Sequence, residues 1–328
     1  AGVNPDDAKL TSELLVKSTL AGHHGHGIGM VRGIVNSIKK GETKPENEII
    51  ILKESPTTAL VDANWSLAHV ASTKCMNIAI EKAEKNNVGV VSYFNTPPTG
   101  RISDFVLLAP PHDMIGMMWV DGYAGVVPFG GADPIFNSSP IAVAIPNGEE
   151  DIFLMDFASS ICSGGKVGLA REEGKLMPEG YIVDKDGNPT RDPSKNYGGI
   201  LPLGGPAGYK GTALAMWVDM LGGILSGRGP AHFSDAPTRG SGVTMIVLKI
   251  DAFRPIEEFK AEGDTLMRAT RDSRKAPGVK RIMVPGEIEW ENERKQLMDG
   301  IKLSKKYWDN RIVVTAGEVG VNLEKLLE

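Results

Sequence analysis

Apolar side chains at helical spacing, flanked by start and stop signals, predict a helix near the beginning of the chain. Residues 4–7 read Asn-Pro-Asp-Asp, where Asn can cap a helix, Pro fits the first turn and the acids face the positive end of the helix dipole. The helix is expected to run to about Ala21, where Gly22 stops it. The following stretch, up to Gly33, is rich in Gly and His and differs from its surroundings.

A second apolar pattern at helical spacing covers residues 67–83, and a strand-like run at 88–94 follows it directly. Further strands are expected over 114–120, 141–145, 152–157 and 243–250, each bounded by Gly, Pro, Asn or Asp. Two more helices are expected over 209–226 and 255–270, with Pro255 in the first turn of the latter. Helical spacing returns after Gly286. Helices at both ends of a sheet-rich centre predict that the two ends pack together as one helical layer.

Glycines gather between these predicted elements, where backbone must turn tightly or approach a ligand closely. No cluster reads Gly-x-Gly-x-x-Gly after a strand, and none has the P-loop pattern ending in Gly-Lys-Ser or Gly-Lys-Thr. The pattern therefore disfavours a Rossmann or P-loop site, although several glycine-rich loops could still hold phosphates.

Composition narrows the class of protein. A chain of 328 residues with 41% hydrophobic content can bury a large core, as one large domain or two interleaved ones. The balance of 36 basic against 41 acidic residues lacks the basic excess that binding to a nucleic-acid backbone requires. Nucleic acid is therefore not an expected partner.

The two cysteines, Cys75 and Cys162, do not form a disulfide framework, which is consistent with a reducing cytoplasm. The most apolar stretch, residues 214–225, contains Asp219 and is far shorter than the roughly 20 apolar residues that cross a bilayer. No membrane segment and no secretory peptide are expected, and a cytoplasmic location fits best.

Three of the six histidines, His23, His24 and His26, stand in one glycine-rich run. Imidazole titrates near neutrality, so a histidine flanked by glycines can approach a substrate hydroxyl and exchange its proton. A plain polar loop after a helix is an equally good interpretation. A metal site made of the three histidines is the least favoured one, because no further Cys, Asp or Glu ligand lies nearby in the sequence.

Several cations are candidates for binding anions. Lys166 and Lys210 stand at expected helix starts, where free N–H groups and a cation suit a pyrophosphate or a carboxylate, although solvated surface lysines are common. Arg32 and Arg101 could each grip a substrate carboxylate through a two-pronged hydrogen bond, or be surface charges. In the turn at 285–287, Glu287 either accepts ribose hydroxyls or merely favours the helix dipole.

Taken together, the motifs follow the order of one family. The chain contains GHHGHGIGM at 22–30, Asn95 with Gly-Arg at 100–101, VPFGG at 127–131, PIA at 140–142, DFASS at 156–160, GKV at 165–167, DKDGNPTRDP at 184–193, LPLGGPAGYKG at 201–211 and PGE at 285–287. This series resembles the type-2 malate/L-lactate dehydrogenase family, which also contains sulfolactate, ureidoglycolate and diketogulonate oxidoreductases. The likeness covers nearly the whole chain.

The resemblance implies an α/β, non-Rossmann fold of the malate/L-sulfolactate dehydrogenase kind, assembled as a homodimer. The expected division is a helical domain from residues 1–65 and 286–328 and a sheet-rich NAD(P)-binding domain from residues 66–285. The resemblance also implies that His26 is the acid/base. It places Lys166 near the nicotinamide, where relatives that act on imines carry Asp. The residues it implies for binding NAD or NADP are Asp156, Ser159, Ser160, Cys162, Lys210, Gly211, Pro285, Gly286 and Glu287.

The chain departs from the family pattern mainly at substrate positions. Gly25 replaces a Ser before the acid/base, and Pro98 replaces a second active-site His. The family's Thr-Asn-Ser segment appears as residues 121–123, beginning at Asp121, and Ser139 replaces the Asn of a Thr-Asn-Pro turn. Met30 stands where many relatives have Arg, and Arg32 is a candidate to substitute for it. Dinucleotide binding is therefore expected to persist while the substrate has drifted.

The expected function is hydride transfer between NAD(P) and a small 2-hydroxy or 2-oxo carboxylic acid of the malate, lactate or sulfolactate type. The expected catalytic residues are His26 and Lys166, and Arg32 and Arg101 are expected to bind the substrate. An alternative on the same fold is NAD(P)H-dependent reduction of a cyclic imine or another ketone. No metal is expected.

Overall fold

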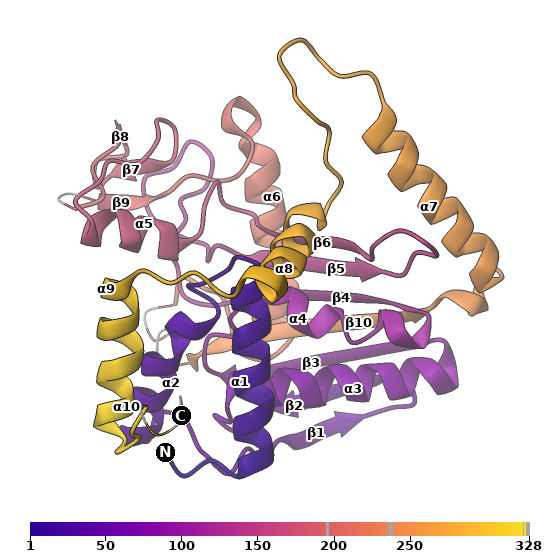
Figure 1. The fold of residues 1–328 in the computed structure, drawn as a ribbon, viewed down its shortest axis with the longest axis horizontal. Helices are drawn as coiled ribbons and strands as arrows, with labels where there is room; N and C mark the ends of the chain where they lie inside the picture. The colour runs from indigo at the N-terminus through magenta and orange to yellow at the C-terminus, as the bar shows by residue number, and fades with distance from the viewer. Residues whose placement is uncertain (195–196, 234, 236–238, 324, 326–328) are drawn as a thin grey trace.

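The structure is a computed structural model of the chain and describes residues 1–194, 197–233, 235, 239–323 and 325. Its centre is a seven-stranded sheet in the order β1-β2-β3-β10-β4-β5-β6 (Figure 1). Strands β2 and β3 pair in parallel, and every other neighbouring pair is antiparallel. Such a sheet is not the parallel doubly wound sheet of a Rossmann fold. The strands are β1 (Ile50–Glu54), β2 (Thr58–Asp62), β3 (Val88–Thr96), β4 (Met114–Asp121), β5 (Pro140–Ile145), β6 (Phe153–Ala158) and β10 (Ser241–Lys249).

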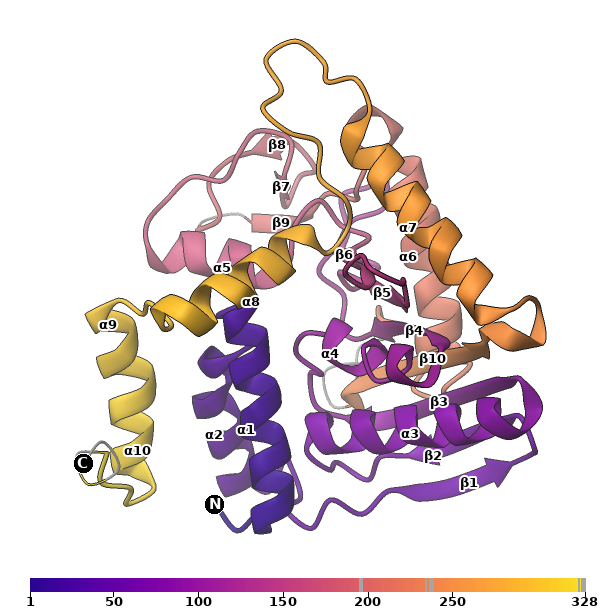
Figure 2. The ribbon, with the colours of Figure 1, turned by 45° about the vertical axis from the view of Figure 1, so that its right-hand side comes forward.

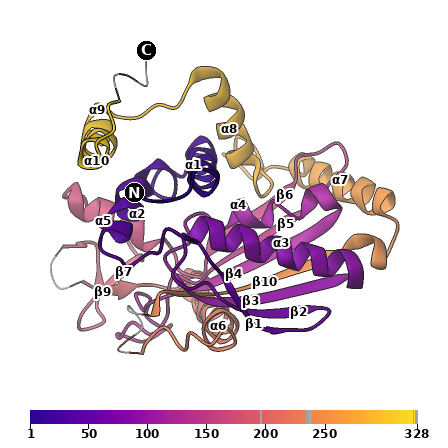
Figure 3. The same cartoon turned by 90° about the horizontal axis from the view of Figure 1, so that it is seen from below.

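Helices cover both faces of this sheet (Figure 3). On one face, α3 (Ala68–Asn86) and α4 (Ser103–Val106) complete the largest apolar core. Helix α3 lies so close to β3 that a Cβ on Gly89 would stand 1.9 Å from the carbonyl oxygen of Ala79, so only glycine fits there. On the other face, α6 (Tyr209–Val218) packs Val218 against the sheet.

A smaller unit extends from one end of the large sheet. Its three strands run in the order β8-β7-β9, and helix α5 (Gly164–Glu172) lies beside them (Figure 1). This unit has its own buried cluster, which includes Cys162, Val167 and Ile182. Its strands are β7 (Ile182–Asp184), β8 (Pro189–Thr190) and β9 (Tyr197–Ile200).

The two ends of the chain form one helical layer, as the sequence pattern predicted. Figure 2 shows α1 (Pro5–Leu20) and α2 (Val31–Lys39) beside the C-terminal helices α8 (Glu287–Asp299) and α10 (Val314–Glu318). The side chain of Gln296 donates to the carbonyl oxygen of Leu20 at 2.7 Å, which joins α8 to the end of α1. A short helix α9 (Lys305–Tyr307) and a π-helical segment, Trp308–Val313, complete the layer.

The predicted helices and strands are confirmed, with three corrections. The helix expected over 209–226 changes at Asp219 from α-helix to the π-helical segment η4 (Asp219–Ile224). Pro255 stands just before α7 (Ile256–Asp272), not inside its first turn. Helix α2, strands β1 and β2 and the small sheet were not predicted. Within the described part of the chain, 3-10 turns lie at Ile28–Met30, Pro110–His112, Gly205–Ala207 and Ile250–Ala252.

The domain division stays a prediction. Strands β1 and β2 belong to the first 65 residues, yet both pair into the large sheet. Both cysteines are buried and free. No helix within the described ranges combines the length and apolar character that a bilayer crossing requires.

Candidate active site

The loop that carries His26 is held flat against the end of α1. The hydroxyl of Thr19 accepts a hydrogen bond from the backbone N–H of Ile28 at 2.9 Å. A Cβ on Gly27 would lie 2.1 Å from that hydroxyl oxygen, so glycine alone permits this approach. The backbone N–H of His26 donates to the carbonyl oxygen of His23 at 3.0 Å. The loop therefore fixes the backbone from which the His26 ring extends.

The surroundings of His26 lower the pKa of its imidazole. His26 is an exposed residue, but nearby protein atoms still desolvate its ring in part. Desolvation is the largest cause of the lowered pKa, and repulsion from His23 is the next. Asp156 and Asp104 oppose the shift, and Arg101 adds to it. The ring is therefore neutral, and able to accept a proton, at a lower pH than an ordinary histidine.

The side chain of His23 and the backbone of His24 contact different partners. His23 lies 3.3 Å from Glu289 of α8, and this contact is the main cause of the lowered pKa of Glu289. The carbonyl oxygen of His24 accepts the hydroxyl of Tyr307 at 3.1 Å. Within the described residues, no three His, Cys, Asp or Glu side chains are placed to hold a metal ion.

Gly100 brings a second segment against this loop. Its φ of +76° lies in the left-handed region, and a Cβ there would meet Met30 Sδ at 3.1 Å, His69 Nε2 at 3.3 Å and the carbonyl oxygen of His26 at 3.5 Å. The residue that follows is Arg101, so the predicted carboxylate clamp adjoins the predicted acid/base.

Arg101 is buried, and its hydrogen bonds are incomplete. Its Nη1 donates to Asp104 Oδ1 at 2.8 Å, and Asp104 Oδ2 accepts the hydroxyl of Ser18 at 2.5 Å. The other two guanidinium nitrogens, Nε and Nη2, are buried and have no partner among the residues that the structure describes. These two nitrogens form one edge of the planar group, the edge that binds a carboxylate in a bidentate manner.

Arg32 and Lys166 lie elsewhere around the same loop. Arg32 of α2 is paired with Glu318 of α10 at 3.0 Å, and both side chains remain partly exposed. Lys166 is exposed in the first turn of α5, where its charge opposes the burial that raises the pKa of Cys162. Helix α5 faces the helical layer, because Arg311 lies 3.8 Å from Glu172. Arg32 is thus engaged in an ion pair, whereas two donors of the buried Arg101 have no partner among the described residues.

The residues expected to line the dinucleotide lie along and just beyond β6. The side chain of Asp156 accepts both the backbone N–H and the hydroxyl of Ser103, at 3.0 and 2.6 Å, and so caps the start of α4. Ser159 and Ser160 are buried, and their hydroxyls donate to the carbonyl oxygens of Ser138 and Cys162. These hydroxyls therefore already have partners within the fold.

Gly211 lies directly against the end of β6, with Lys210 exposed beside it. A Cβ on Gly211 would meet the backbone of Leu203 at 2.3 Å and the carbonyl oxygen of Ser159 at 2.9 Å. The backbone N–H of Leu203 donates to that same carbonyl oxygen at 2.8 Å. Segments about 50 residues apart in the sequence are therefore brought together at one place.

The turn at 285–287 meets the beginning of the same strand. A Cβ on Gly286, whose φ is +91°, would meet the Cβ of Leu154 at 2.8 Å. The carboxylate of Glu287 accepts the backbone N–H of Val284 at 3.0 Å and lies 3.6 Å from Arg271. This carboxylate is committed to the start of α8 and to an arginine, which favours the helix-start interpretation over ribose binding.

Three residues near or within the site, His69, Asp104 and Ser18, were not recognised from the sequence. His69 is buried in α3, burial lowers its pKa to about 4, and its Nε2 faces Gly100. Asp104 and Ser18 orient Arg101. A histidine within an otherwise apolar helix face was the available signal for His69. The Arg-x-x-Asp spacing was the available signal for Asp104.

The positions at which the chain departs from the family pattern differ in how closely they are packed. A Cβ on Gly25 would meet nothing within 4 Å, so a serine would fit there. Asp121 is fully buried and lies 3.1 Å from Arg228. Ser139 is buried at a φ of +45°, a conformation in which Asn is favoured over Ser.

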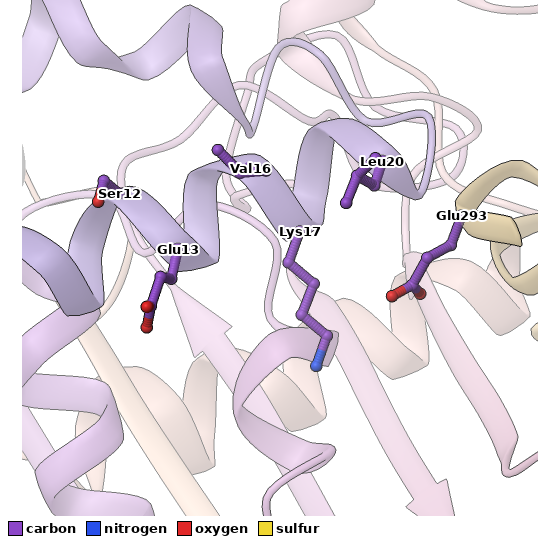
Figure 4. Close-up of a pocket in the computed structure, with 6 residues that line it drawn as sticks. All are labelled: Ser12, Glu13, Val16, Lys17, Leu20 and Glu293. Carbon is purple, nitrogen blue, oxygen red and sulfur yellow. The ribbon is translucent and has the colours of Figure 1, made fainter. Parts of the chain in front are cut away.

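Two cavities lie near this region. Figure 4 shows the smaller, an open groove of about 290 Å³ along α1, with Lys17 beside Glu293 of α8. It contains none of the expected site residues. The larger, of about 500 Å³, lies between the end of α2, Trp65, Tyr123 and the prolines Pro97 and Pro98.

Comparison with known proteins identifies the same family along almost the whole chain. The family model described as "Malate/L-lactate dehydrogenase" matches residues 1–310. The chain is 37% identical to the L-sulfolactate dehydrogenase of Methanocaldococcus jannaschii, over 100% of this chain and 94% of that protein. It is 32% identical to an Escherichia coli ureidoglycolate dehydrogenase (NAD(+)), over 92% of this chain and 87% of that protein.

Solved structures agree. The M. jannaschii sulfolactate dehydrogenase superposes with a TM-score of 0.88 at 36% identity and covers 100% of this chain and 94% of its own. The Δ1-piperideine-2-carboxylate reductase of Pseudomonas syringae superposes with a TM-score of 0.82 at 25% identity, over 94% of this chain and 92% of its own. The expected non-Rossmann fold is confirmed.

Proposed function

Because the chain belongs to the malate/L-lactate dehydrogenase family and is an oxidoreductase of hydroxy acids, we propose that it transfers hydride between NAD(P) and a small 2-hydroxy or 2-oxo acid. One observation carries the proposal. The imidazole of His26, whose pKa is lowered mainly by desolvation, extends from a loop packed against the segment that bears Arg101, a buried cation with two donors that have no partner among the described residues. A proton acceptor and a carboxylate binder are thus adjacent.

In this proposal, His26 and Arg101 have different roles. His26 accepts the hydroxyl proton in oxidation and returns it in reduction. Arg101 binds the substrate carboxylate through Nε and Nη2, and this fixes the reacting carbon relative to the imidazole. Arg32, bound to Glu318, is at most a peripheral charge.

The dinucleotide would lie along β6, from the Pro285-Gly286 turn to Ser159 and Gly211. The close backbone approaches at Gly211 and Gly286 leave no room for larger side chains. Lys166 and Lys210 are exposed cations suited to the phosphates and the nicotinamide side of the site. When bound, NAD(P) supplies the hydride donor or acceptor.

The coarser organisation of the protein is part of the same proposal. The helical domain is assigned residues 1–65 and 286–328 and the cofactor domain residues 66–285, with β1 and β2 of the first segment joining the sheet of the cofactor domain. Large apolar side chains such as Leu266 and Met298 are 69% and 80% exposed, which supports a homodimer that covers part of this surface. The buried, free cysteines are consistent with a cytoplasmic location. Light scattering tests the dimer.

A second candidate is reduction of a cyclic imine. The likeness to the P. syringae reductase and the open position at Gly25 favour it. Lys166 favours the alcohol and ketone reaction. A panel of 2-oxo acids and cyclic imines, followed by NADH and NADPH absorbance, separates the two reactions and the two cofactors.

His26→Ala tests the assignment directly. With the best acid of the panel, turnover is expected to fall roughly a hundredfold or more, while the affinity for the reduced cofactor stays within a factor of about two. His112→Ala, which removes an exposed histidine from the turn at Pro110–His112, serves as the control. Unchanged turnover in His26→Ala would remove His26 from the mechanism.

A further inference from the structure

The larger cavity has walls of two kinds. Trp65, Tyr123, Pro97 and Pro98 form flat, mainly apolar walls, while polar side chains line the side nearest the end of α2. Its volume of about 500 Å³ lies within the range of pockets that bind whole small molecules, and it exceeds what a methyl or carboxymethyl group would fill.

Trp65 is held in the cavity wall by strained backbone. Its φ of +59° is an outlier for a bulky residue, and the preceding Asn64 has a φ of +52°. Two backbone hydrogen bonds fix this conformation. The N–H of Trp65 donates to the carbonyl oxygen of Asn95, and the carbonyl of Trp65 accepts from Lys44, both at 2.8 Å. Strain maintained by its surroundings is typical of positions that serve a ligand.

Pro97 and Pro98 of the cavity wall belong to the same chain segment as Gly100 and Arg101. Pro98 stands two residues before Gly100, so their Cα atoms are at most roughly 7 Å apart. Gly100 in turn packs against Met30 and the carbonyl oxygen of His26, and Arg101 follows it. A substrate whose carboxylate is bound at Arg101 could therefore extend its side chain past Gly100 towards Trp65.

Resting on the proposed function, we propose that this cavity receives the side chain of the 2-oxo or 2-hydroxy acid, and that the enzyme prefers acids with an aromatic side chain. Aromatic rings and prolines offer flat faces on which a ring can stack. A second carboxylate would be disfavoured, because Glu42 lies at the polar side and the ammonium of Lys44 is already bonded to Asn64.

The test compares kcat/KM for phenylpyruvate, pyruvate and oxaloacetate in the full-length protein and three variants. Trp65→Gly removes the ring, and glycine adopts the positive φ without strain, so the fold is retained. Tyr123→Ala alters the opposite wall at an exposed position. Phe253→Ala, 77% exposed beyond β10, is the matched aromatic control.

We expect the wild-type protein to prefer phenylpyruvate by tenfold or more. Trp65→Gly is expected to lower kcat/KM for phenylpyruvate roughly tenfold while pyruvate changes less than about twofold, with a smaller effect in the same direction for Tyr123→Ala. Phe253→Ala should change nothing.

Turnover of pyruvate or oxaloacetate with no preference for phenylpyruvate would overturn this proposal and leave the proposed function standing. Weaker binding of reduced cofactor to Trp65→Gly, with an equal loss for all three acids, would also overturn it, because the cavity would then serve the cofactor. No turnover with any of the acids would overturn the proposed function, and this proposal with it.

Discussion

Among the described residues are two buried arginine–aspartate pairs, and they differ in how completely the hydrogen-bond donors of the arginine are satisfied. Arg101 and Asp104 join at 2.8 Å with side chains 2% and 1% exposed. Arg228 and Asp121 join at 3.1 Å with both side chains fully buried. By charge and burial alone, the two pairs are alike.

Their remaining contacts separate them. Arg228 also donates through Nε to the carbonyl oxygen of Gly240 at 2.8 Å and through Nη1 to that of Gly229 at 3.2 Å. Arg101 keeps Nε and Nη2 without a partner among the described residues. Buried donors are normally satisfied, so the unused edge, rather than the burial of a charge, marks Arg101 as a binding group.

The acids beside the two arginines differ as well. Asp121 faces Asp219, and burial first, then repulsion between the carboxylates, raises the pKa of Asp121 to about 8. One retained proton and the guanidinium of Arg228 then neutralise the carboxylates of Asp121 and Asp219, where β4, β10 and η4 meet. Burial also raises the pKa of Asp104, although Arg101 and the hydroxyl of Ser18 oppose that shift.

Removal of Arg228 gives the largest expected effect. Arg228→Met leaves Asp121 and Asp219 buried without their cation, so the free energy of unfolding is expected to fall by about 3–5 kcal/mol. Urea unfolding followed by circular dichroism measures this change. A loss below about 1 kcal/mol would contradict the structural role.

Arg101→Lys should affect binding more than stability. Lysine keeps the charge beside Asp104 but lacks the planar edge, so KM for the acid is expected to rise roughly 10- to 100-fold. The affinity for the reduced cofactor should stay the same, as measured by fluorescence titration. A cofactor defect with unchanged KM would place Arg101 outside the carboxylate site.

The Asp121–Asp219 pair predicts a dependence of stability on pH. The folded state holds a proton that the unfolded state has released once the pH exceeds about 4, so stability falls as the pH rises towards 8. One such proton contributes a slope of about 1.4 kcal/mol per pH unit. Urea unfolding between pH 5 and 8 should show a flatter slope in Asp121→Asn. Equal slopes in the two proteins would show that the pair holds no proton.

The smallest effect is expected for Arg32→Gln. Its pairing with Glu318 is partly exposed, so its loss should cost about 0–1 kcal/mol of stability. KM should change less than about twofold. If Arg32→Gln raised KM as much as Arg101→Lys, the two arginines would share the carboxylate, and the contrast between them would disappear.

Local signals in the sequence were sufficient for the longest helices, for five strands of the large sheet and for part of the candidate site. Asn4 caps α1 as expected, with its side chain accepting the N–H of Asp7, because capping depends on residues three apart. The glycine-flanked His26 could be singled out because its loop is built from neighbouring residues. The order of motifs identified the family and so the fold, which local patterns alone would not have specified.

Only the tertiary structure decided which charged residues pair with each other and which donors are left without a partner. Asp121 and Arg228 are 107 residues apart, and nothing between them in the sequence indicates that they meet. Packing between distant segments also produces three other features. These are the edge of Arg101 without partners, the approach of His69 to Gly100, and the strained backbone of Trp65 in the cavity wall. Periodicity and capping report contacts a few residues apart, whereas burial and hydrogen-bond satisfaction depend on which surfaces the complete fold brings together.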